Sequence, residues 1–188
     1  MALRLNIIIG STRPGRIGPK VAEWFQGFAV EHGKFDAKLV DLVNFELPVY
    51  DEPKHPRLQQ YEHTHTKRWA ESVASADAFV FVTPEYNYFA PPALINAITY
   101  LSKEWAYKPA GLLSYGGVSG GLRAAQSEKL LLTSQRIMPI PEGVAVQMVN
   151  QYVGEDGVFR PSDLIASGAK TMLDELHRWA EALKPMRG

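Results

Sequence analysis

The sequence predicts a doubly wound α/β fold: a five-stranded parallel sheet with helices on both faces, in a single domain that spans residues 1–188. Three observations lead to this prediction. Short β-rich segments alternate with helix-like segments along the whole chain. Residues 78–82 are continuously apolar, which is typical of a strand buried on both faces of a parallel sheet. The length is sufficient for one full hydrophobic core, and the chain contains no repeat, linker or low-complexity segment.

Each element follows from its local pattern. The first strand, residues 5–9, is rich in isoleucine, and the helix predicted over residues 18–32 carries its apolar side chains on one face. Residues 35–42 alternate apolar and polar side chains, which predicts a strand with one exposed side. Residues 48–56 contain three prolines and are predicted to form a loop before a polar helix over residues 58–75. Further along the chain, we expect strands at residues 110–115 and 144–146, and helices at residues 93–101, 122–137 and 162–183.

The loop after the first strand, residues 10–18 (GSTRPGRIG), has the composition of an anion site. Its backbone N–H groups and the following helix N-terminus carry partial positive charge, and Arg13 and Arg16 add forked donors. A Walker loop would need Lys-Ser/Thr where Arg16-Ile17 stand, and the dinucleotide fingerprint would need a glycine in place of Thr12. A terminal phosphomonoester therefore fits better than a pyrophosphate. The alternative is an ordinary strand-to-helix turn with solvated arginines.

Ligands of doubly wound sheets bind outside the carboxyl ends of the strands, so the loops after the first, third and fourth strands should converge. The second of these, residues 83–92 (TPEYNYFAPP), combines three prolines with Tyr86, Tyr88 and Phe89. A stiff backbone beside flat side chains suits a planar ligand. The alternative is that the aromatic side chains fill the core or a subunit contact, which we favour for Phe89. Glu85 in this loop is either an acid beside the ligand or a residue that points outward.

The third loop, residues 114–121 (SYGGVSGG), has four glycines in six positions. Such a loop is costly to order, so either the backbone closely approaches a ligand or the packing is crowded. Arg123, just inside the next helix, is expected either to serve a phosphate or to face water. The three loops together predict a planar, monophosphorylated ligand, for which FMN is the natural candidate.

Composition and the remaining motifs exclude several other classes of protein. Lysine and arginine total 20, as do aspartate and glutamate, so no overall charge attracts nucleic acid or an anionic membrane. The absence of cysteine excludes disulfides, cysteine-ligated zinc and thiol catalysis. No apolar stretch approaches the roughly 20 residues of a membrane span, and the first residues show no signal-peptide pattern. We therefore expect a cytoplasmic protein.

Metal binding is not expected either. His63 and His65 lie two positions apart on a predicted helix, so their side chains should diverge. Asp51 and Glu52, adjacent acids in a proline-rich loop, are expected to be solvated. Trp105 either covers a substrate or packs in the core, and we favour packing.

Residues 10–13 (GSTR), 84–87 (PEYN), 94–98 (LINAI) and 114–117 (SYGG) resemble the NADPH-dependent FMN reductase family of flavodoxin-like proteins. The resemblance runs from residue 5 to about residue 146, with the motifs in the family's order. It implies that three groups of residues bind the cofactor. The phosphate loop matches Ser11, Arg13, Arg16, Ile17 and Gly18; the segment along the isoalloxazine and ribityl chain matches Pro84, Glu85, Tyr86 and Asn87; and the loop at the pyrimidine edge matches Tyr115, Gly116, Gly117 and Val118.

The resemblance further implies an NAD(P)H-dependent oxidoreductase. NADPH or NADH would pass hydride to bound FMN, and a small acceptor (a flavin, quinone, azo compound or chromate) would then be reduced in a ping-pong cycle. No residue is assigned a catalytic role, and a homodimer or homotetramer is implied. Two alternatives remain: a flavodoxin-type electron carrier and a non-catalytic flavodoxin-like module. The chain lacks the acidic block with which many carriers dock, which disfavours the first alternative.

Overall fold

A five-stranded, all-parallel sheet in the order β2-β1-β3-β4-β5 organises the computed structural model, which describes residues 2–187. The strands are β1 (Leu3–Ile9), β2 (Phe35–Asp41), β3 (Ala78–Pro84), β4 (Pro109–Tyr115) and β5 (Met138–Val146). The α-helices are α1 (Gly18–His32), α2 (Thr64–Ala74), α3 (Pro92–Thr99), α4 (Leu122–Ser134) and α5 (Asp163–Leu183). Five short 3₁₀ helices are η1 (Leu42–Phe45), η2 (Pro56–Leu58), η3 (Lys103–Trp105), η4 (Val149–Tyr152) and η5 (Lys184–Met186). The predicted doubly wound fold is confirmed.

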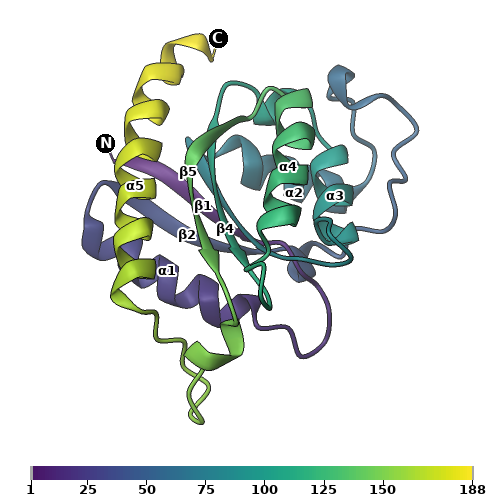
Figure 1. Ribbon diagram of the computed structural model, residues 1–188. Coiled ribbons are helices and arrows are strands. Elements are labelled where there is room, and N and C mark those ends of the chain that lie inside the picture. Colours follow the sequence, from purple (N-terminus) through teal and green to yellow (C-terminus); the bar gives the residue numbers. More distant parts are fainter. Residues whose placement is uncertain (1, 188) are drawn as a thin grey trace.

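The helices form a layer on each face of the sheet (Figure 1). Helices α1 and α5 cover one face, where Phe25 and Met172 are fully buried. Helices α2, α3 and α4 cover the other face, where Trp69 and Trp105 are fully buried. Every residue of β3 and β4 is buried, because these two central strands are covered on both sides. Within residues 2–187, none of the helices is long and apolar enough to cross a membrane.

The order of the strands reverses beside β1, since β1 lies between β2 and β3. At such a switch point the loops that follow neighbouring strands diverge and leave a crevice at the carboxyl end of the sheet. The loops after β1, β3 and β4 all open at this end, as predicted from the sequence.

Helix α2 is shorter than predicted, since it begins at Thr64 rather than near residue 58. Residues 56–58 instead form η2, which ends at Gln59 in a left-handed conformation (φ 53°). The Glu52 carboxylate accepts the backbone N–H groups of Glu62 (2.8 Å) and His63 (3.0 Å), the two residues that precede α2. A carboxylate earlier in the same connection therefore fixes the backbone where this helix begins.

The last strand and the helix before it also differ from the prediction. Strand β5 begins at Met138 and includes Pro139 and Pro141, which an edge strand tolerates because its outer side needs no N–H donors. Helix α4 ends at Ser134 rather than at residue 137, since Arg136 adopts a left-handed conformation (φ 59°).

Candidate functional site

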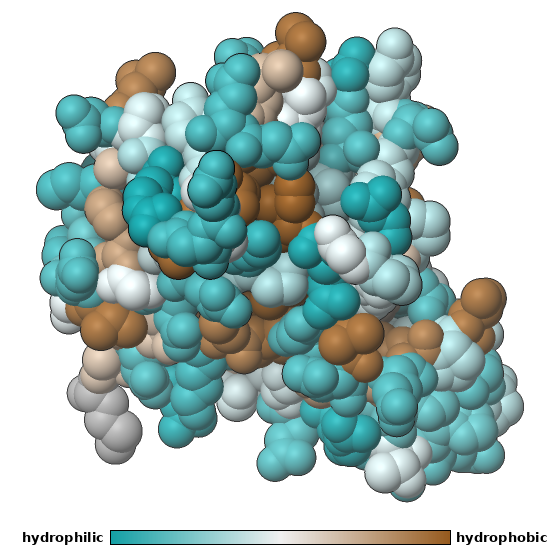
Figure 2. Space-filling view, turned by 90° about the horizontal axis from the view of Figure 1, so that it is seen from below, coloured by the Kyte–Doolittle hydropathy of each residue, from teal (hydrophilic) through white to brown (hydrophobic). Residues whose placement is uncertain are grey.

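The loops after β1, β3 and β4 meet at the carboxyl end of the sheet. The Ser11 and Tyr86 hydroxyl groups share a hydrogen bond of 2.7 Å, which joins the first loop to the second. The Arg13 guanidinium lies 6.0 Å from the centre of the Tyr86 ring. Figure 2 shows the molecule from this end, with hydrophobic side chains exposed in the middle of a mostly hydrophilic face.

The β1–α1 loop leaves donors free at the start of α1. No side chain caps the N-terminus of this helix. Pro19 has no N–H and the Lys20 N–H donates to Ile17 O (2.9 Å), so the N–H groups of Ile17 and Gly18 are those left for an anion. Ser11 is fully buried, whereas Arg13 is exposed. Gly10 is required because a Cβ there would lie 2.9 Å from the Leu94 side chain, and Gly15 adopts a φ of +71°. These features fit a phosphate group.

The two arginines of this loop differ in what they can bind. The Arg16 guanidinium forms an ion pair with Asp41 at the end of β2, and both side chains are largely buried. Its Nε is also buried, with no partner among residues 2–187. Sequence reasoning missed Asp41, which fixes Arg16 against the sheet, whereas Arg13 forms no ion pair within residues 2–187.

The β3–α3 loop presents its aromatic side chains to solvent. A tight turn joins Tyr86 and Phe89 through two backbone hydrogen bonds of 2.9 and 3.0 Å, and Asn87 and Tyr88 between them both have positive φ. Tyr88 and Phe89 are each 61% exposed, so Phe89 does not fill the core. Pro84, in contrast, is buried at the end of β3.

Glu85 links the second loop to the third. Its Oε1 accepts Arg123 Nε (2.7 Å) and Nη2, and its Oε2 accepts the Arg123 backbone N–H and the Ser119 hydroxyl, both at 3.1 Å. The hydrogen bonds from Arg123 lower the pKa of Glu85, which favours its ionised form. The Arg123 guanidinium also lies 3.9 Å from the centre of the Tyr88 ring. Glu85 therefore points toward Arg123 and Ser119 rather than outward. Arg123, whose side chain is 51% exposed, pairs with Glu85 as well as facing water.

The glycines of the β4–α4 loop serve two purposes. A Cβ on Gly116 would meet Gly121 N at 3.2 Å, while Gly120 and Gly121 have φ of +58° and +77°. These three glycines are explained by crowding and turn geometry. A Cβ on Gly117 would meet nothing within 4 Å. At Gly117 there is therefore space for a ligand to approach the backbone closely.

The segment after β5 forms a further wall that sequence reasoning missed. The backbone N–H groups of Met148 and Val149 donate to the carbonyl oxygens of Gly117 (2.9 Å) and Gly116 (3.0 Å). They thereby fix the glycine loop. The position of this segment could have indicated its role, because it directly follows a strand that the sequence predicts to end at the same edge of the sheet.

The four segments enclose a mainly apolar cavity of about 250 Å³. Its lining includes six of the predicted cofactor residues, Ile17, Pro84, Glu85, Tyr115, Gly116 and Gly117, together with Met148, Val149, Asn150 and Gln151. The other predicted residues lie outside this lining: Ser11, Arg13, Arg16 and Gly18 at the β1–α1 loop, Tyr86 and Asn87 at the tight turn, and Val118 beyond Gly117. An apolar cavity next to a polar anion site fits a planar molecule with one phosphate.

A separate cluster corrects three expectations from the sequence. His63 precedes α2, so the His63 and His65 rings do not diverge but stack, with centroids 5.1 Å apart. Asp51 accepts the Tyr100 hydroxyl (2.8 Å) and contacts His65 Nε2 (3.0 Å), and Glu52 is buried, so neither acid is merely solvated. Within residues 2–187, no three such side chains are arranged to hold a metal ion. Trp105 is fully buried, which confirms that it packs in the core.

Comparison with known proteins gives a consistent result. A family model described as NADPH-dependent FMN reductase matches residues 3–151. The NAD(P)H-dependent FMN reductase C4B3.06c of Schizosaccharomyces pombe is 41% identical over 125 residues, covering 65% of this chain and 62% of that protein. The NAD(P)H-dependent FMN reductase LOT6 of Saccharomyces cerevisiae is 33% identical over 158 residues, covering 78% of this chain and 81% of that protein. Among solved structures, the flavoenzyme FerB from Paracoccus denitrificans is similar with a TM-score of 0.76 and 22% identity, covering 96% of this chain and 98% of that one.

Proposed function

The chain belongs to the NADPH-dependent FMN reductase family, and we propose on that basis that it is an NAD(P)H-dependent oxidoreductase with FMN at the carboxyl end of its sheet. The observation that carries this proposal is the convergence of the three predicted loops on one apolar cavity beside an uncapped helix N-terminus. When bound, FMN supplies the redox chemistry, taking hydride from NAD(P)H and then reducing a second substrate.

The phosphate would be held at the start of α1. Ser11, Arg13 and the backbone N–H groups of residues 17 and 18 offer hydrogen-bond donors there, and the helix dipole favours negative charge. The Arg16 side chain, already paired with Asp41, would contribute through its buried and unpaired Nε. Leaving that N–H without a partner is costly in a folded protein, which supports a ligand at this position.

The ring system would lie in the apolar cavity, between Pro84 and the Gly116–Gly117 segment. Gly117 leaves room for the ring to approach the backbone, and Glu85 orients the loops around it. The ionised Glu85 carboxylate does not supply a proton at neutral pH. This leaves the chain with the tasks of binding and orienting, and no residue is assigned a catalytic role.

The acceptor would be a small molecule. Relatives include an NADPH azoreductase from a Bacillus species (33% identity) and a quinone reductase from Pseudomonas putida (30% identity). An open, mainly apolar cavity suits flat acceptors of these kinds, as well as free flavin, and chromate is a further candidate. A reaction that consumes NAD(P)H favours a cytoplasmic location. We also propose a homodimer or homotetramer, since large apolar side chains are exposed beside the cavity.

An anaerobic titration with NADPH tests the function. The protein is loaded with FMN, freed of excess flavin and followed by visible absorbance, with free FMN at the same concentration as the control. We expect rapid, stoichiometric bleaching of the bound flavin. A bound flavin that NADPH does not bleach would indicate an electron carrier instead, and failure to retain FMN would overturn the assignment of the site.

A further inference from the structure

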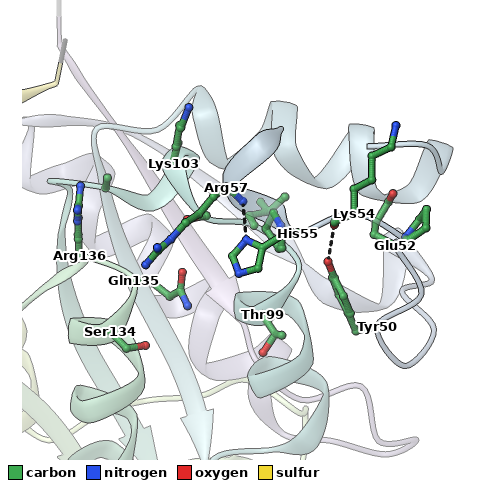
Figure 3. A pocket seen from close by; sticks show the side chains of 15 residues that line it. Tyr50, Glu52, Lys54, His55, Arg57, Thr99, Lys103, Ser134, Gln135 and Arg136 are labelled. Atoms are coloured by element: carbon green, nitrogen blue, oxygen red, sulfur yellow. Dashed lines mark hydrogen bonds between the residues drawn. The ribbon is translucent and has the colours of Figure 1, made fainter. Parts of the chain in front are cut away.

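A second and larger cavity, of about 700 Å³, lies at the opposite end of the sheet (Figure 3). Its walls are residues 50–57 and the segments that immediately precede β4 and β5, which are residues 99–106 and 134–136. Because β4 and β5 begin here, the cavity lies at the amino ends of these strands, whereas the proposed flavin site lies at their carboxyl ends. The redox chemistry proposed above leaves this cavity without a role.

The wall formed by the long connection between η1 and α2 is held in place by hydrogen bonds. Gln59 Nε2 and the Tyr61 hydroxyl both donate to Glu104 Oε1 at 2.9 Å, which fixes the connection against η3. The Tyr50 backbone N–H donates to Asn96 Oδ1 (3.0 Å), which fixes it against α3. Connections of this length in a compact domain usually have a function. The cavity is therefore a built feature, not a gap under a loose loop.

The lining of this cavity is strongly cationic in a chain with no net charge. It contains Lys54, Arg57, Lys103 and Arg136 but a single carboxylate, that of Glu52. The Glu52 carboxylate accepts two backbone N–H groups at the start of α2. Lys54 has Glu62 at 3.6 Å, whereas Arg57, Lys103 and Arg136 form no ion pair within residues 2–187. Three of the four cations are thus free to bind an anion.

His55 adds a neutral donor to these charges. Its Nδ1 accepts the Arg57 backbone N–H at 3.1 Å, so in the neutral ring the proton resides on Nε2. Figure 3 shows the imidazole beside the Arg57 side chain, which extends toward Gln135 and Arg136. A guanidinium, an imidazole N–H and an amide therefore gather on one side of the cavity.

The rest of the lining combines apolar side chains with the polar groups of Thr99, Ser102, Ser134 and Gln135. Pro53, Pro56, Leu101 and Ala106 contribute hydrocarbon surface, and Tyr50 contributes an aromatic ring. Guanidinium and ammonium groups match phosphate oxygens, and apolar or aromatic surface suits a ring. The volume is within the range of cavities that hold cofactor-sized molecules.

We propose that this cavity binds a phosphorylated organic molecule of nucleotide size. Arg57, Lys103 and His55 hold the phosphate oxygens, and the wall of Pro53, Pro56 and Leu101 takes the ring. A competing explanation needs no ligand: cations near the carboxyl ends of α3 and α4 offset the partial negative charge of these helix ends. The two explanations differ in what substitution of Arg57 and Lys103 changes. The first predicts lost binding, and the second predicts lost stability alone.

The test is isothermal titration calorimetry of the FMN-loaded protein with ADP, adenosine and inorganic pyrophosphate as separate probes. We expect ADP to bind more tightly than either fragment. In the double variant Arg57→Gln/Lys103→Gln, the Kd for ADP should rise about tenfold or more, since each lost contact is a charge-assisted hydrogen bond. The matched control removes two exposed cations elsewhere, Lys67→Gln/Lys184→Gln, and should leave the Kd unchanged. Melting temperatures are measured for all three proteins.

Each of the other outcomes would overturn the proposal. In the first, ADP does not bind at millimolar concentration and the Arg57/Lys103 variant has a lower melting temperature. This result is expected if the cations only offset the partial negative charge of the helix ends. Another is equal loss of affinity in the control variant, which indicates only general charge attraction. ADP binding that the Arg57/Lys103 substitutions leave unchanged would locate the ADP elsewhere. Pyrophosphate that binds as tightly as ADP would contradict the role of the apolar wall.

Discussion

Arg13 and Arg16 stand three residues apart in one loop, yet they have different tasks. Arg16 is fixed by Asp41, whereas Arg13 is exposed and without a salt-bridge partner among residues 2–187. The sequence places both arginines in the predicted phosphate loop without distinguishing their roles, and the structure separates a paired arginine from an unpaired one. Spacing in the chain could not show this, because Asp41 belongs to another strand.

Substitution of Arg13 by alanine should weaken FMN binding. A charge-assisted hydrogen bond is worth roughly 1.5–3 kcal/mol, so we expect the Kd to rise about 10- to 100-fold. Quenching of FMN fluorescence measures this, and the matched control is Lys67→Ala on α2. Riboflavin, which lacks the phosphate, should bind the wild type and the Arg13→Ala variant equally. Unchanged FMN affinity would contradict the assignment of Arg13 to the phosphate.

Glu128 makes the stability of the protein depend on pH. It is 1% exposed on α4, contacts the Thr83 hydroxyl at the end of β3, and burial raises its pKa to about 8. The folded protein then keeps a proton that the unfolded chain releases above the ordinary pKa of 4.5. The free energy of unfolding should therefore fall between pH 4.5 and about 8, and level off above that pH.

The variant Glu128→Gln should remove this fall, which we expect to reach up to roughly 5 kcal/mol in the wild type. The measurement is the urea midpoint of both proteins at pH 5, 7 and 9. At pH 9 the variant should be the more stable of the two. If both proteins show the same pH dependence, Glu128 is not the responsible group.

At the scale of elements, two glycines of the β4–α4 loop are expected to have different roles, Gly121 in stability and Gly117 in FMN binding. Gly121 has a φ of +77°, and a Cβ there would lie 2.8 Å from the Tyr115 carbonyl oxygen, whereas a Cβ on Gly117 meets open space. Gly121→Ala should therefore lower the free energy of unfolding by at least about 2 kcal/mol. Gly117→Ala should leave stability nearly unchanged and weaken FMN binding. Urea unfolding and an FMN titration of both variants check the pair, and comparable FMN affinity of Gly117→Ala and wild type would contradict a role for Gly117 in the site.

The start of α2 gives a second prediction at this scale. Burial raises the pKa of Glu52, but the hydrogen bonds from the N–H groups of Glu62 and His63 outweigh it, so that the net shift is downward. The stability from this cap is therefore present above the ordinary pKa of 4.5 and is lost as the pH falls through the lower folded value. Glu52→Gln should cost about 1–2 kcal/mol at pH 7 and little at pH 3. Glu62→Gln, which leaves the backbone donor in place, is the control, and an equal cost at both pH values would contradict the charged cap.

The elements that sequence reasoning predicts well are those whose own residues determine them. The apolar run of β3 and the range of α1 are confirmed because local pattern and tertiary packing agree. The start of α2 is not predictable from its own residues, since the Glu52 carboxylate, earlier in the same connection, binds the N–H groups just before the helix. The fourth wall of the candidate site was missed for a related reason: Met148 and Val149 act through backbone hydrogen bonds that leave no mark on side-chain composition.

The whole molecule has two distinct ends. The carboxyl end of the sheet carries the apolar cavity with its anion site, and the amino end carries the larger cationic cavity. Neutral total charge conceals this separation, because the cations of the amino end are balanced by acids distributed elsewhere. Composition alone therefore does not reveal a local cationic pocket.

We propose that copies of the chain associate through the surface beside the proposed flavin cavity. Tyr88, Phe89, Val118 and Leu122 are between 51% and 83% exposed on the loops after β3 and β4 and at the start of α4. Exposed aromatic and aliphatic side chains grouped in this way usually mark an interaction surface. Association through this surface would bury the rim of the cavity and shield the ring system from water.

We therefore expect light scattering after size-exclusion chromatography to give the mass of a dimer or tetramer for the wild type. The double variant Phe89→Asp/Leu122→Asp should shift the protein toward the monomer, because each carboxylate would have to be desolvated in the interface. Leu164→Asp, which alters an 83% exposed residue on α5 at the opposite face of the sheet, is the control and should keep the assembly intact. A monomeric wild type would refute the proposed assembly. An assembly that only Leu164→Asp disrupts would place the interface on α5 and leave the flavin cavity open in every subunit.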